Sequence, residues 1–107
     1  MSQISREITI LIVDDHPVVR QGLKMIIEEE DSFTVCGETG NANEAITLIG
    51  KMSPDVVLVD ITLQGSATGL DLISSMQERF PSVPALVISM HDESMYAERA
   101  IMAGAKG

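Results

Sequence analysis

The sequence predicts an α/β protein built on a doubly wound parallel β-sheet. Short apolar runs rich in β-branched residues alternate with longer segments whose apolar residues recur at helical spacing. The runs have no polar face, so both sides of the sheet need helices as cover. The 107 residues suit one domain. Because 45% of them are hydrophobic and only 3% are aromatic, the core is expected to be aliphatic.

The first half of the chain predicts two strand–helix units. A continuous apolar strand is expected at 8–13, and Pro17 suits the first turn of the following helix. The sheet-facing side of that helix is predicted to be Val19, Leu23, Ile26 and Ile27. A second strand follows at 33–37. Asn41 and Glu44 then resemble a capping box, before a helix with an inner face of Ala45, Ile46 and Ile49.

The second half repeats the pattern. A third strand is expected at 56–59, and the composition of 64–69 indicates a loop. Thr68 is a suitable cap for a helix that directs inward Leu70, Ile73, Met76 and Phe80. The fourth strand is expected at 85–88, and a last helix from about 93 to 103.

Composition excludes several classes of function. A net charge of −9 repels phosphate backbones, so this segment is not expected to bind nucleic acid directly. Its apolar runs fall short of the roughly 20 residues of a membrane span. The N-terminus lacks the apolar core of a signal peptide, which makes a cytoplasmic location the default. Cys36 is the only cysteine, which excludes an internal disulfide, and it is expected to be a buried, inert thiol.

Three carboxylates follow two of the predicted strands directly. Asp14 and Asp15 come after the first strand, and Asp60 comes after the third. In open parallel sheets, ligands bind beyond the carboxyl ends of the strands, where the strand order reverses. If the first and third strands are neighbours, as in a 2-1-3-4 order, these carboxylates converge.

Such convergence is costly without a counter-charge. Two unit charges ~4 Å apart repel by about 4 kcal/mol at an effective dielectric near 20. The cluster persists if a cation offsets the repulsion or if a proton is shared. A donor set of oxygens favours Mg²⁺ or a similar hard ion. A carboxylate beside Mg²⁺ can attack a phosphoryl group to form an aspartyl phosphate, and the Ser89 hydroxyl is placed to reach the same crevice.

Simpler interpretations of these residues stay open. Asp15 can cap the helix that begins near Pro17, and Asp60 can be a turn former. His16 is interpreted as a helix-start residue rather than a metal ligand.

Four segments together resemble a known family. They are ILIVDDHP at 10–17, VVLVDI at 56–61, VIS at 87–89 and AGAKG at 103–107. The set resembles the receiver domains of two-component response regulators, in particular the subfamily with a C-terminal LuxR-type helix-turn-helix domain. The resemblance implies a flavodoxin-like sheet of order 2-1-3-4-5. Residues 1–107 would be one receiver domain, with the fifth strand and the helix that follows it missing from this chain.

The resemblance also implies a phosphorylation site with its metal. Asp60 matches the phosphoacceptor. Asp15 matches the direct Mg²⁺ ligand, and Asp14 matches the ligand that acts through water. Asp60 and the backbone carbonyl of Thr62 would complete the Mg²⁺ site.

Further positions match residues of the family that take part in its conformational switch, and others depart from the family pattern. Ser89 matches the switch hydroxyl, and His91 matches a position that tunes phosphoryl lifetime together with Thr62. Gln64 stands where the family often has Pro. The active-site lysine of the family is not matched, because Lys106 is out of register and is read as a surface residue.

The function implied is that of a phosphoacceptor signalling domain rather than an enzyme. A sensor histidine kinase would phosphorylate it, and the output would be transcription through a DNA-binding domain outside this chain. Two alternatives are a degenerate receiver that acts only as an interaction module and a haloacid dehalogenase-like phosphatase. Failure to bind Mg²⁺ or accept a phosphoryl group favours the first, and turnover of a phosphomonoester favours the second. The uncovered apolar strand at 85–88 predicts a homodimer or an edge-paired oligomer.

Overall fold

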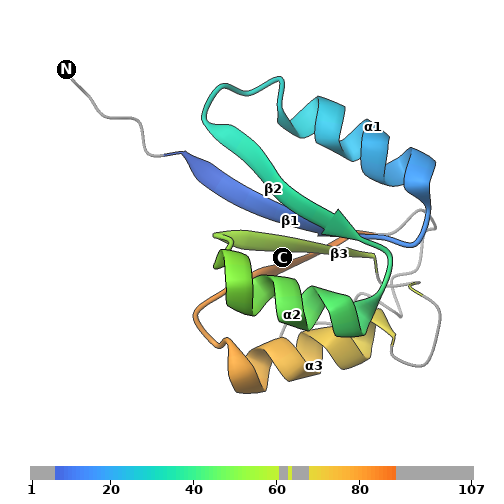
Figure 1. Ribbon diagram of the computed structural model, residues 1–107, viewed down its shortest axis with the longest axis vertical. Helices are drawn as coiled ribbons and strands as arrows, with labels where there is room; N and C mark the ends of the chain where they lie inside the picture. Colours follow the sequence, from blue (N-terminus) through green and yellow to red (C-terminus); the bar gives the residue numbers. More distant parts are fainter. Residues whose placement is uncertain (1–6, 61–62, 64–67, 89–107) are drawn as a thin grey trace.

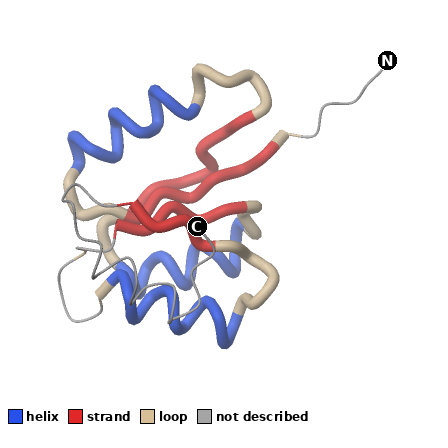
Figure 2. The backbone as a smooth tube through the Cα atoms, turned by 180° about the vertical axis from the view of Figure 1, so that it is seen from behind, coloured by secondary structure: helices blue, strands red, loops and turns tan. Residues whose placement is uncertain are grey.

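The computed structural model describes residues 7–60, 63 and 68–88. They form a four-stranded parallel sheet of order β2-β1-β3-β4, which confirms the predicted order. The strands are β1 (Ile8–Val13), β2 (Phe33–Thr39), β3 (Val56–Asp60) and β4 (Ala85–Ile88). The helices are α1 (Pro17–Ile27), α2 (Ala42–Met52) and α3 (Gly69–Arg79). In Figures 1 and 2, α1 covers one face of the sheet, and α2 and α3 cover the other.

The core consists of two aliphatic clusters, one on each face of the sheet. Alternate residues of the central strands supply both, since side chains along a strand point to opposite faces. On the α2 and α3 side, the buried residues include Leu11, Val13, Ile49, Val57, Leu72, Ile73 and Met76. On the α1 side, the buried residues are Ile10, Ile12 and Leu58, with Leu23 and Ile27 of α1 packed against them. The central strands β1 and β3 are therefore held from both faces.

Both predicted helix caps are present, but only the cap at Thr68 forms a complete capping box. Thr68 and Asp71 form a full capping box at the start of α3, in which each side chain accepts from the backbone N–H of the other residue. At α2, the Asn41 side chain accepts from the Glu44 N–H at 2.9 Å, as predicted. The Glu44 carboxylate, however, accepts from the Thr39 hydroxyl at the end of β2. That carboxylate therefore ties α2 to the strand before it.

The structure corrects three details of the sequence interpretation. Strand β2 continues to Thr39 because Glu38 and Thr39 still pair with the end of β1, beyond a register shift in that ladder. Ile26 was expected on the packed face of α1, yet it is 67% exposed. Only one flank of α1 contacts the sheet, and Ile26 lies off it. Cys36 is partly rather than fully buried, and this burial raises the pKa of its thiol.

Some predictions fall on residues that the structure leaves undescribed. The last helix expected near 93–103 lies outside the described residues. Within the described part of the chain, no helix is both long and apolar enough to cross a bilayer.

Candidate functional site: an acidic cluster at the carboxyl ends of β1 and β3

The strand order brings the predicted carboxylates together. Strands β1 and β3 are paired neighbours, so the residues that end them lie side by side. The backbone N–H of Asp14 donates to the Thr39 carbonyl at 2.9 Å, which extends the β1–β2 ladder by one residue. Asp60 is the last residue of β3 and pairs in register with Ile88 of β4. The backbones of Asp14 and Asp60 are thus fixed by the sheet.

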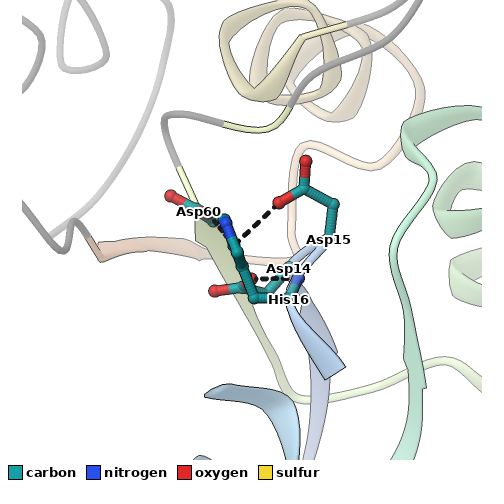
Figure 3. A group of neighbouring side chains, drawn as sticks. All are labelled: Asp14, Asp15, His16 and Asp60. Atoms are coloured by element: carbon teal, nitrogen blue, oxygen red, sulfur yellow. Dashed lines mark hydrogen bonds and ion pairs between the residues drawn. The ribbon is translucent and has the colours of Figure 1, made fainter. Parts of the chain in front are cut away.

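Figure 3 shows the resulting group of Asp14, Asp15, His16 and Asp60. One potential ligand atom from each residue lies within 4.8 Å of the others. The Asp14 side chain is fully buried, the Asp60 side chain is 1% exposed, and the Asp15 side chain is 25% exposed. Two carboxylates are therefore withdrawn almost completely from water, while the third is partly accessible to it.

His16 completes the cluster in a way that the sequence interpretation did not anticipate. Its Nδ1 lies 3.0 Å from Asp14 Oδ1 and 2.9 Å from Asp15 Oδ1. The hydrogen bond to Asp14, followed by the negative charge of Asp15, raises the pKa of His16 above its ordinary value. His16 is the N-cap residue of α1, but its side chain makes no capping hydrogen bond. The N-cap position of α1 thus belongs to His16 and not to Asp15, the residue suggested for it from the sequence.

A second set of contacts holds the loop between β1 and α1. Arg20 donates from Nη1 to the Asp14 carbonyl at 2.5 Å and from Nε to Glu38 at 2.9 Å. Gly40 packs against the same backbone: a Cβ placed there would lie 3.2 Å from the Cα of Asp15. The first turn of α1 and the end of β2 together fix the Asp14–Asp15 backbone.

The residues present fit a divalent cation. Asp14 Oδ2 is buried without a hydrogen-bond partner among the described residues, which is costly for a charged group unless something else satisfies it. Octahedral ligands at ~2.1 Å from Mg²⁺ lie roughly 3 to 4.2 Å apart. The ligand atoms of the cluster all lie within 4.8 Å of one another, a limit slightly wider than these separations. The carboxylate oxygens match the hard-ligand preference of Mg²⁺.

Sequence interpretation identified the three aspartates correctly as one cluster, and it missed the position of the His16 ring. Thr62, Ser89 and His91 lie outside the described residues, so their predicted roles stay predictions.

The comparisons with known proteins agree with this fold and site. The model of the response regulator receiver domain family matches residues 10–107. The chain is 35% identical to the transcriptional regulatory protein DegU of Brevibacillus brevis, over 94% of this chain and 42% of that protein. It is 37% identical to the transcriptional regulatory protein YdfI of Bacillus subtilis, over 92% of this chain and 45% of that protein.

Solved structures give the same result. A LuxR-family two-component response regulator from Aurantimonas sp. SI85-9A1 superposes with a TM-score of 0.88 and 35% identity, covering 94% of this chain and 71% of that one. The receiver domain of the putative response regulator NarL from Mycobacterium tuberculosis gives a TM-score of 0.86 at 29% identity, covering 94% of this chain and 80% of that one.

The parallel sheet of order β2-β1-β3-β4, the acidic cluster at its carboxyl edge and these matches together indicate a receiver-type signalling domain. The chain belongs to the response regulator receiver domain family. It spans less than half the length of the curated relatives named above. These matches give no support to the alternative, raised from the sequence, that the chain is a haloacid dehalogenase-like phosphatase.

Proposed function

We propose that Asp60 accepts a phosphoryl group from the phosphohistidine of a sensor histidine kinase. The observation that carries this proposal is the convergence of Asp14, Asp15 and Asp60 at the carboxyl ends of the paired strands β1 and β3. An oxygen of the Asp60 carboxylate attacks phosphorus, the P–N bond of the donor breaks, and its electron pair returns to the imidazole nitrogen. The product is an acyl phosphate on Asp60.

Asp14, Asp15, Asp60 and the backbone carbonyl of Thr62 are the proposed Mg²⁺ ligands. When bound, Mg²⁺ supplies the positive charge that offsets the carboxylates and the incoming phosphoryl oxygens. Asp14 and Asp60 are held by backbone hydrogen bonds of the sheet, so they are placed before any ligand arrives. Burial of their side chains excludes water from one side of the reacting carboxylate.

The proposed consequence of phosphorylation is a conformational shift. Ser89 directly follows β4, the strand that pairs with β3, and its hydroxyl would donate to a phosphoryl oxygen. Thr62 and His91 would set how long the acyl phosphate lasts. The output is transcription through a DNA-binding domain outside this chain, in keeping with the transcriptional regulators to which the chain is similar. A cytoplasmic location follows from this role.

Transfer from acetyl phosphate to the natural full-length protein tests the assignment. With Mg²⁺ present, the wild-type protein is expected to gain one phosphoryl group, and Asp60→Asn none. Asp31→Asn, an exposed aspartate after α1, is the matched control and should label like the wild type. Absence of labelling in the wild type with acetyl phosphate and with a kinase donor would favour a receiver that acts only as an interaction module.

A further inference from the structure

The His16 ring lies against the carboxylate oxygens that a cation would contact. Its Nδ1 is 3.0 Å from Asp14 Oδ1 and 2.9 Å from Asp15 Oδ1. The same atom is 3.9 Å from Asp60 Oδ2. Figure 3 shows the imidazole between the carboxylates of the β1 and β3 ends.

The backbone directs the ring to this position. His16 precedes Pro17, and a residue before proline is restricted to extended conformations. Its φ of −108° and ψ of 105° are of this kind. The His16 N–H donates to Asp14 Oδ1 at 2.8 Å, which fixes the peptide beside the cluster. Because the side chain makes no capping bond to α1, its contacts serve the cluster rather than the helix.

We propose that His16 is a built-in occupant of the cation site, which Mg²⁺ must displace in order to bind. This inference rests on the Mg²⁺ site of the proposed function. The Nδ1–H group donates to Asp14 and Asp15 and so partly offsets the repulsion within the cluster when no metal is bound. Mg²⁺ prefers oxygen ligands and water to imidazole, so the ring leaves when the ion enters instead of joining its shell.

In this role His16 lowers the affinity of the site for Mg²⁺, whereas a ligand would raise it. The two roles predict opposite signs when the ring is removed. Removal of the ring also takes away the hydrogen bonds that partly offset the repulsion in the metal-free cluster. The stability of the protein without Mg²⁺ should therefore fall, while its affinity for Mg²⁺ rises. Asp14 Oδ2, which has no hydrogen-bond partner among the described residues, remains available to the ion or its water in either case.

Isothermal titration with Mg²⁺ at a fixed pH tests this in the natural full-length protein. We expect His16→Ala and His16→Leu to bind Mg²⁺ about tenfold more tightly than the wild type, the scale of one hydrogen bond to a charged group. His16→Leu keeps a side chain of substantial length and so guards against a packing defect. Val18→Ala is the matched control, because Val18 lies in the first turn of α1 and is 82% exposed.

Thermal melting gives a second readout. Both His16 variants should melt below the wild type in EDTA, and the difference should shrink at saturating Mg²⁺. Equal or weaker Mg²⁺ binding by both variants, with binding by the wild type intact, would overturn the inference. Weaker binding of Mn²⁺ in particular would make His16 a ligand. If neither the wild type nor the variants bind Mg²⁺, the metal site of the proposed function fails, and this inference fails with it.

Discussion

Asp14, Asp15 and Asp60 differ in their surroundings, and this difference separates their expected roles. Asp14 is fully buried, and its Oδ1 already accepts a hydrogen bond from the His16 backbone. Asp15 is partly exposed to solvent. The carboxylate of Asp15 can therefore move into the inner shell of an ion at little cost, whereas the hydrogen bond from His16 restrains Asp14.

Removal of each β1-end carboxylate should therefore weaken Mg²⁺ binding unequally. Asp14→Ala is expected to cost roughly 10–100-fold in affinity, the usual effect of losing an outer-shell partner. Asp15→Ala should cost more, because an inner-shell oxygen is lost. Calorimetric titration of both variants against the wild type measures the order. Equal Mg²⁺ affinity in the wild type and Asp15→Ala would remove Asp15 from the site.

Sequence reasoning predicted the aspartates of the site but not the position of the His16 ring. The three aspartates could be predicted from two facts that a sequence carries. Each lies at the end of an apolar strand or just after it, and the carboxyl ends of parallel strands lie at the same edge of a sheet. The direction of the His16 ring depends on backbone angles set by Pro17 and on the Asp14 hydrogen bond. The one available signal was its place between an acidic pair and a proline.

At the scale of secondary-structure elements, polar contacts at strand and helix ends position the site. Arg20 links α1 to the ends of β1 and β2. The capping box of Thr68 and Asp71 fixes the start of α3, the next described helix after β3 in the chain. Hydrogen bonds from the Thr68 backbone and then from its side chain lower the pKa of Asp71.

The Asp71 cap predicts a pH-dependent contribution to stability. Because its pKa is lower in the folded state than in the unfolded state, ionised Asp71 stabilises the fold above its unfolded pKa. This contribution is lost as the pH falls through the folded pKa. Asp71→Asn should therefore melt below the wild type at pH 7, and the two curves should converge in acid.

Melting profiles over this pH range check the prediction. Glu78→Gln, on an exposed position of the same helix, is the control for simple loss of a negative charge. A constant difference between Asp71→Asn and the wild type at every pH would show that the ionised carboxylate has no part in the cap.

Two glycines give a matched test of how the β1–α1 loop is held. Gly40→Ala would place a Cβ 3.0 Å from Arg20 Nη1 and 3.2 Å from the Cα of Asp15, so it should push on the site and weaken Mg²⁺ binding. Gly22 lies inside α1, and apart from its chain neighbours and the backbone of its own helix, no atom of the described residues lies within 4 Å of its added Cβ. Gly22→Ala should raise stability by about 0.5–1 kcal/mol and leave Mg²⁺ affinity unchanged.

Titration and denaturant unfolding of both variants measure these effects. A Gly40→Ala protein with the Mg²⁺ affinity and the stability of the wild type would show that Gly40 is not tightly packed on the Asp15 backbone.

Some features of the helices and strands could not be predicted from the sequence. The pattern at 33–37 resembles a strand because it is apolar, while Glu38 and Thr39 are polar and look like a loop. They extend β2 because the end of β1 offers backbone partners, a long-range pairing that local composition does not encode. Ile26 fitted the helical period, but only one flank of α1 meets the sheet.

At the scale of the whole molecule, the two faces of the described sheet are covered unequally. Among the described elements, α2 and α3 lie on one face and α1 lies on the other (Figure 1). Leu86 of β4 pairs in register with Leu58 on the α1 side and is 43% exposed. Strand β4 is also an edge of the sheet in the described part of the chain. An apolar edge of this kind favours pairing with another copy.

We therefore expect residues 1–107 on their own to associate as concentration rises, and Leu86→Lys to reduce the association. A charge on an edge strand opposes pairing. Sedimentation velocity over a range of concentrations measures the effect, with Val18→Ala as a control for loss of an exposed apolar side chain elsewhere. A wild-type segment that stays monomeric at every concentration would show that this edge does not need a partner.

The most direct test of the account is to locate the phosphoryl group chemically. The natural full-length protein is phosphorylated with Mg²⁺ and a phosphoryl donor and then reduced with borohydride, which converts an aspartyl phosphate to homoserine. Peptide mass mapping then reads the modified position. We predict homoserine at position 60 and none at Asp14 or Asp15. Homoserine at either of these residues, with position 60 unchanged, would contradict the assignment of Asp60 as the phosphoacceptor.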